Sequence, residues 1–143
     1  MPQLLDVNML IALCDADHVY HTKARNWFKQ ESINGWATCP ITENGFLRVL
    51  SNSGYPGSKH QTAEVANLLF ALKNLPGHEF WEDDFSLVDE MSNISFDSVS
   101  SKSITDLYLL ILALKRKGRL ITLDRRINPK AIIGGVQALE VIS

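Results

Sequence analysis

Residues 4–13 read LLDVNMLIAL, and this stretch decides the fold class of the chain. Leu4, Leu5 and Val7 form a short apolar run, which favours a strand buried on both faces. The residues from Met9 to Leu13 have the spacing that starts a helix. A short buried strand followed by a helix is the beginning of a βαβ unit, from which parallel sheets are built.

The same alternation of short apolar segments and helical spacing continues along the chain. Further strands are expected at residues 36–39, 79–81, 120–123 and 139–142. Helices are expected at residues 20–28, 40–50, 62–75 and 103–117, the last with Ser103 as N-cap. The segment that follows the expected strand 79–81 and continues to Ser101 has no decisive pattern. We therefore expect one α/β domain over residues 1–143, with a central parallel β-sheet of about four to five strands and helices on both faces.

Composition narrows the function classes. The chain has 143 residues, of which 45% are hydrophobic and 21% charged, as expected of a globular domain with a real core. Its formal net charge is -2, from 14 basic and 16 acidic residues, without the basic excess of dedicated nucleic-acid binders. Any contact with nucleic acid must therefore be local, or brief and catalytic.

Three features predict a cytoplasmic protein with no membrane association. Cys14 and Cys39 are too few for a disulfide framework in a domain of this size, which favours a reducing compartment. The N-terminus has no basic segment and reaches Asp6 early, unlike a signal peptide. The longest apolar run, residues 107–114, is far too short to cross a bilayer.

Four acidic residues stand where a parallel sheet places its chemistry. Asp6 and Asp124 follow predicted strands, and the carboxyl ends of such strands form the usual crevice. Glu43 and Asp106 lie in the first turns of helices that begin at the same edge. Clustered carboxylates repel one another unless a hard cation such as Mg²⁺ or Mn²⁺ joins them, and such ions promote phosphodiester hydrolysis.

Two neutral residues near these acids carry side-chain oxygens. Asn8 and Thr122 are suited to orienting a carboxylate or a metal-bound water. We therefore expect them as accessory polar residues of the same site.

Helix capping and turn formation are the alternative explanations for these acids. Asp106 stands three residues after Ser103, as in a capping pair, and Glu43 is also a first-turn acid. Asp124 can begin a turn. Asp6 is harder to explain structurally, because it interrupts an apolar run at the edge of a sheet.

Four blocks of the sequence resemble PIN-domain nucleases of the VapC type, the toxins of bacterial toxin–antitoxin pairs. They occur in the family's order and are residues 4–13 (LLDVNMLIAL), 36–46 (WATCPITENGF), 105–110 (TDLYLL) and 120–124 (LITLD). The resemblance implies a PIN fold, ribonuclease activity with Mg²⁺ or Mn²⁺, homodimerisation and a cognate antitoxin. It places the family's metal-binding acids at Asp6, Glu43, Asp106 and Asp124, and its accessory polar positions at Asn8 and Thr122. No further acid closely follows Asp124, which leaves a second metal site in doubt.

A basic cluster surrounds the last of these blocks. It holds seven of the 14 basic residues: Lys115, Arg116, Lys117, Arg119, Arg125, Arg126 and Lys130. It is either a phosphate-contacting patch or a helix C-terminus followed by a solvated turn. Arg125 and Arg126 are the candidate RNA contacts, because they adjoin Asp124.

The leading hypothesis is a divalent-metal-dependent endoribonuclease, the toxin of a toxin–antitoxin pair that inhibits translation by cutting RNA. One alternative is a non-catalytic RNA- or partner-binding module of the same fold. Another is a phosphotransferase with Asp6 as nucleophile, although such enzymes usually have a second acid where this chain has Asn8.

Overall fold

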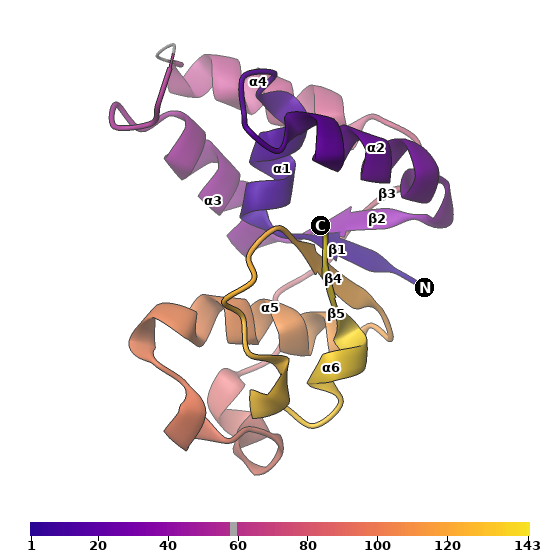
Figure 1. Cartoon of the computed structure of the whole chain (residues 1–143), viewed down its shortest axis with the longest axis vertical. Helices are drawn as coiled ribbons and strands as arrows, with labels where there is room; N and C mark the ends of the chain where they lie inside the picture. The colour runs from indigo at the N-terminus through magenta and orange to yellow at the C-terminus, as the bar shows by residue number, and fades with distance from the viewer. Residues whose placement is uncertain (58–59) are drawn as a thin grey trace.

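A five-stranded sheet with all strands parallel organises the chain, in the order β3-β2-β1-β4-β5. The computed structural model describes residues 1–57 and 60–143 (Figure 1). The strands are β1 (Gln3–Leu5), β2 (Trp36–Thr38), β3 (His78–Phe80), β4 (Arg119–Thr122) and β5 (Leu139–Val141). The prediction of a parallel sheet in an α/β fold is confirmed.

Helices cover both faces of this sheet (Figure 1). On one side lie α1 (Val7–Cys14), α2 (His21–Glu31), α3 (Pro40–Leu50) and α4 (Thr62–Lys73). On the other side lie α5 (Ile104–Lys115) and the short α6 (Gly135–Ala138). None of the helices within these described ranges is long and apolar enough to cross a membrane.

The apolar residues of β1 and β4 are buried on both faces because each face of the sheet contributes to a separate core. Leu5 and Ile121 point to the side of α1–α4, where Trp36 is among the largest buried side chains. Leu4 and Leu120 point to the other side and pack with α5. Successive residues of a strand point to opposite faces of the sheet. A strand that is buried on both faces is therefore mainly apolar along its whole length.

The structure corrects several expected boundaries near the site. Val7 is the first residue of α1 and not part of the strand, because the Asp6 carboxylate accepts a hydrogen bond from the Val7 N–H (2.8 Å) and caps the helix. Trp81, Leu123 and Ile142 lie just beyond the strands to which they were assigned. The undecided region after β3 contains 3₁₀ turns at Leu87–Asn93, Phe96–Ser98 and Ser101–Ser103.

Ser103 is the N-cap residue of α5, as predicted, but its side chain does not cap the helix. Ser103 ends a 3₁₀ turn with helical backbone angles, and its side chain makes no capping hydrogen bond. Its hydroxyl lies 3.2 Å from the hydroxyl of Ser100 instead. The capping pair proposed between Ser103 and Asp106 is therefore absent, and capping does not explain the acid at position 106.

Candidate active site

The candidate site lies where the connections of the sheet change direction. The next strand along the chain, β2, lies on one side of β1, and the later strand β4 lies on its other side. In parallel sheets this arrangement opens a crevice at the carboxyl ends of the two strands. Asp6 follows β1 and Asp124 lies two residues beyond β4, and the pairing of Leu5 with Ile121 sets the two strand ends side by side.

Asp6 is the most buried acid of the site, with 5% of its surface exposed. One carboxylate oxygen accepts from the Val7 N–H at 2.8 Å, and the other accepts from the Thr122 hydroxyl at 2.8 Å. Burial raises the pKa of Asp6 above its ordinary value, and the charge of Asp124 adds to this, although the two hydrogen bonds oppose it. Asp6 is thus a desolvated carboxylate held in one orientation.

Asn8 and Thr122 form the hydrogen-bonded base of the site. The Asn8 amide donates to the Thr122 hydroxyl oxygen at 3.3 Å and accepts from the Leu123 N–H at 3.2 Å. The Thr122 oxygen also accepts from the Asp124 N–H at 3.0 Å. These bonds tie the turn after β4 to the start of α1 and so fix the position of Asp6 relative to Asp124.

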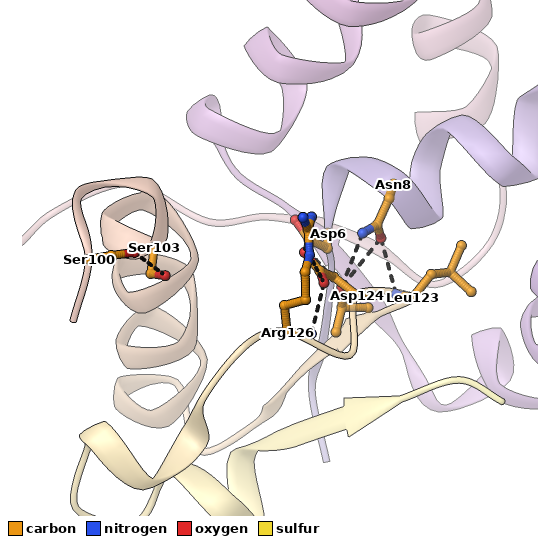
Figure 2. A network of polar contacts seen from close by, with 8 residues as sticks. Asp6, Asn8, Ser100, Ser103, Leu123, Asp124 and Arg126 are labelled. Carbon is orange, nitrogen blue, oxygen red and sulfur yellow. Dashed lines mark hydrogen bonds and ion pairs between the residues drawn. The ribbon is translucent and has the colours of Figure 1, made fainter. Parts of the chain in front are cut away.

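Asp124 is paired with Arg126. Arg126 Nε lies 3.0 Å from Oδ1 of Asp124, and Arg126 Nη2 lies 3.2 Å from Oδ2 (Figure 2). The backbone N–H of Arg126 donates to the same carboxylate at 2.9 Å, so Asp124 also begins a turn, as the alternative explanation expected. These hydrogen bonds from Arg126 hold the pKa of Asp124 below its ordinary value.

Asp106 projects from the first turn of α5 toward the same crevice. Its pKa is raised to about 6, first by partial burial and then by the charges of Asp6 and Asp124. A carboxylate that is destabilised by two others belongs electrostatically to the same cluster. The structure therefore brings Asp6, Asp106 and Asp124 together from three distant segments.

These acids line an open cleft with a volume of about 350 Å³. Its walls come from the start of α1, the second half of α3, the first turns of α5 and the turn after β4. Besides the acids, it is lined by Val7, Asn8, Ile11, Arg48, Val49, Thr105 and Leu109.

Glu43 is not among the residues of this cleft. Its carboxylate accepts from the Thr38 hydroxyl at 2.6 Å and pairs with Lys73 of α4 at 2.9 Å. The Thr38 oxygen is in turn 2.7 Å from Nε2 of His78. Glu43 therefore lies where α3 meets α4, apart from the other predicted acids.

The rotation of α3 explains this placement. A Cβ on Gly45 would lie 2.6 Å from Cγ2 of Val7, so Gly45 marks the face of α3 that touches α1. Two residues correspond to roughly 200° around a helix, which directs Glu43 to the opposite side. In this structure three of the four predicted acids line the cleft, and Glu43 is directed to Lys73 of α4.

The donor set of the cleft fits a hard divalent cation. Three carboxylates and the neighbouring amide oxygen of Asn8 offer oxygen ligands alone, the type that Mg²⁺ and Mn²⁺ prefer. A cation would also relieve the repulsion that raises the pKa of Asp106. Within residues 1–57 and 60–143, no three acidic, histidine or cysteine side chains already stand in ligating geometry. A cation held by all three carboxylates would have to draw them closer together.

The basic cluster of the sequence divides into two parts. Arg116 and Arg119 pair with Asp84 and Glu140, and Lys115 pairs with Glu90. They lie at the end of α5 and the start of β4, which is the opposite edge of the sheet from the cleft. For these residues the solvated helix end is the correct interpretation.

Only Arg125 and Arg126 of the cluster's arginines adjoin the acids, and both are exposed. Sequence reasoning missed Arg48, which reaches the cleft from α3. No local pattern identifies Arg48, because its position depends on how α3 packs on α1.

Comparison with known proteins identifies the family of this chain. Residues 4–132 match the PIN domain family. Ribonuclease VapC44 of Mycobacterium tuberculosis (strain ATCC 25618 / H37Rv) is 42% identical over 137 residues, which cover 96% of this chain and 96% of the relative. Ribonuclease VapC39 of the same strain is 42% identical over 140 residues, covering 97% and 100%, and Ribonuclease VapC38 is 43% identical over 121 residues, covering 85% and 84%. This chain therefore belongs to the PIN domain family.

Proposed function

We propose that this PIN-domain protein is a divalent-metal-dependent endoribonuclease that hydrolyses RNA phosphodiester bonds and serves as the toxin of a toxin–antitoxin pair. The observation that carries the proposal is the meeting of Asp6, Asp106 and Asp124 in one cleft at the switch point of the sheet. The similarity to proteins named ribonucleases supports the choice of RNA as substrate.

In this proposal Asp6, Asp106 and Asp124 hold Mg²⁺ or Mn²⁺. When bound, such an ion activates a water and stabilises the oxygens of the displaced phosphodiester. Thr122 keeps Asp6 in place by donating to its carboxylate, and the Asn8 amide supports Thr122 in turn. Arg125 and Arg126 stand beside Asp124, where they can contact RNA phosphates.

Glu43 has a different role in this proposal. It holds Thr38, the last residue of β2, and it neutralises Lys73 of α4. A residue with these contacts fixes the corner from which α3 starts. Glu43 then supports the site by positioning α3, without coordinating the ion.

The proposal extends to partners and compartment. A toxin of this family acts on cellular RNA, inhibits translation, and is neutralised by a cognate antitoxin protein. We also propose that the chain forms a homodimer, which sedimentation or size-exclusion measurements would test. The free thiols of Cys14 and Cys39 support action in the reducing cytoplasm.

The two alternatives make different demands on the cleft. A phosphotransferase with Asp6 as nucleophile needs an acid two residues further on, and Asn8 there is engaged with Thr122 and Leu123. A non-catalytic RNA- or partner-binding module does not need three carboxylates in one cleft, where burial first and then the charges of Asp6 and Asp124 raise the pKa of Asp106 to about 6.

The test is RNA cleavage by the purified protein. We expect cleavage with Mg²⁺ or Mn²⁺, and its loss on adding a chelator or in Asp6→Asn and Asp106→Asn. Asp89→Asn is the matched control, because Asp89 is an exposed acid outside the cleft. Cleavage that persists in Asp6→Asn prepared by the same procedure would contradict the proposal. If cleavage depends on Asp6 as expected, mapping the cut ends in cellular RNA after brief expression would identify the substrate.

A further inference from the structure

Arg48 is the basic side chain that lines the cleft together with the three acids, among the residues that the structure describes. It is an exposed side chain on α3, and it lines the same cavity as Asp6, Asp106 and Asp124. Among the residues that the structure describes, none accepts a hydrogen bond from Arg48 or lies within ion-pair distance of it. A guanidinium group is therefore available in the cleft beside carboxylates that could have neutralised it.

The packing of α3 places Arg48 there. Gly45 brings α3 against Val7, the residue directly after Asp6, at a distance that leaves no room for a Cβ. Arg48 follows Gly45 by three residues, and side chains with this spacing share one face of a helix. The close contact that sets α3 on α1 thus places Arg48 in the lining of the acidic cleft.

The contrast with other basic side chains makes this availability informative. Several of the chain's cations are engaged with acids, in the pairs Lys73–Glu43, Lys115–Glu90, Arg116–Asp84, Arg119–Glu140 and Arg126–Asp124. Arg48 is near a dense group of acids but is not engaged by them. A cleft lined by carboxylates and by a guanidinium that no described residue engages offers an RNA strand two kinds of contact.

We propose that Arg48 binds a phosphate of the RNA backbone next to the one being cut, and so sets the register of the strand over the acids. This inference rests on the proposed ribonuclease function. The planar guanidinium can donate two parallel hydrogen bonds to a phosphate, which a lysine ammonium cannot match. Contacts of this kind position a nucleic acid without reading its sequence.

The experiment measures binding without cleavage. Asp6→Asn protein is titrated with a short fluorescein-labelled single-stranded RNA of mixed sequence at several salt concentrations, alone and combined with Arg48→Gln, Arg48→Lys or Arg25→Gln. Arg25 is an exposed arginine of α2 outside the cleft, and serves as the charge-matched control.

We expect Arg48→Gln to weaken binding about tenfold at low salt and to reduce the slope of log K against log salt by about 0.7, the loss of one phosphate contact. Arg48→Lys should restore the slope and recover only part of the affinity. In the active background, Arg48→Gln should raise KM with little change in kcat. Its metal-induced rise in Tm should equal that of the unsubstituted protein, because Arg48 is not a metal ligand.

The inference is overturned if Arg48→Gln and Arg25→Gln bind with the same affinity and the same salt slope. It is also overturned if Arg48→Gln alters the metal-induced rise in Tm as strongly as Asp106→Asn does. A protein that binds RNA through Arg48 but does not cleave it would contradict the ribonuclease proposal alone. The binding measurement therefore tests the role of Arg48, and the cleavage measurement tests the ribonuclease proposal.

Discussion

Arg126 spans both carboxylate oxygens of Asp124, with Nε 3.0 Å from Oδ1 and Nη2 3.2 Å from Oδ2. Arg126 is almost fully exposed, with 91% of its side-chain surface accessible, so this pair forms in high dielectric and can be broken easily. A cation that binds to the cleft competes with this guanidinium for the same oxygens. We therefore expect Arg126 to compete with a metal ion for the carboxylate of Asp124.

Removing this competitor should strengthen metal binding. We expect Arg126→Gln to bind Mg²⁺ or Mn²⁺ about threefold more tightly, the small effect typical of an exposed ion pair. Titration calorimetry measures the affinity directly. Arg125→Gln is the control, since it removes the same charge from the neighbouring exposed position. Equal affinities in the two variants would mean that the Arg126 pair does not compete with the ion.

Asp106 should make the metal-free protein less stable as pH rises. Its pKa is about 6 in the folded state against an ordinary value of 3.8, so the folded state binds more protons between these values. The stability that protonation supplies is complete below about pH 4 and is lost as pH rises through about 6.

Asp106→Asn should remove this pH dependence. At pH 7 we expect the variant to be more stable than the unsubstituted protein by about 1 kcal/mol, after allowing for solvent screening of a half-exposed group. This corresponds to a rise in Tm of about 2–4 °C. Thermal unfolding in chelator from pH 4 to pH 8 provides the measurement. If the difference in Tm between the two proteins is the same at pH 4 and at pH 8, the explanation is refuted.

Glu43 should be dispensable for metal binding. We expect Glu43→Gln to keep most of the metal-induced rise in Tm, because Glu43 is engaged with Thr38 and Lys73 and does not line the cleft. Asp6→Asn and Asp106→Asn should lose that rise. In chelator, Glu43→Gln should be less stable, since it leaves Lys73 half-buried without its partner. If Glu43→Gln abolished the metal-induced rise in Tm, Glu43 would have to be counted among the metal ligands.

Gly45 should be required for the packing of α3 on α1. Gly45→Ala places a methyl group 2.6 Å from Cγ2 of Val7, and overpacking of this kind costs about 1–3 kcal/mol. The better helix propensity of alanine returns about 1 kcal/mol, so the net loss should be about 1 kcal/mol.

A double-mutant cycle tests the cause. In the Val7→Ala background, which removes the methyl group in the way, Gly45→Ala should be neutral or stabilising in urea unfolding. If Gly45→Ala is equally destabilising with and without Val7, the clash is not the reason for the glycine.

The sequence was sufficient to predict the acids that follow directly from strands. Asp6 and Asp124 end short apolar segments, and the carboxyl ends of parallel strands lie at one edge of the sheet whatever the details of packing. Asp106 could be placed at the same edge because its helix begins there. For these residues the secondary structure alone determines the position.

The positions of Glu43 and Arg48 could not be predicted in this way. Both depend on the rotation of α3 about its own axis, which is set by the contact between Gly45 and Val7. These two residues are far apart in the sequence, and helical periodicity does not show which neighbour a glycine touches. The missing cap at Ser103 has a similar cause, since the chain enters α5 through a 3₁₀ turn.

The three-carboxylate site can be observed directly by anomalous diffraction from crystals of the protein grown with Mn²⁺. We expect one manganese peak within coordination distance of carboxylate oxygens of Asp6, Asp106 and Asp124, with Arg126 moved away from Asp124 and Glu43 still paired with Lys73. Crystals with no peak at these carboxylates, or with a peak at Glu43 alone, would contradict the assignment of the metal to this cleft.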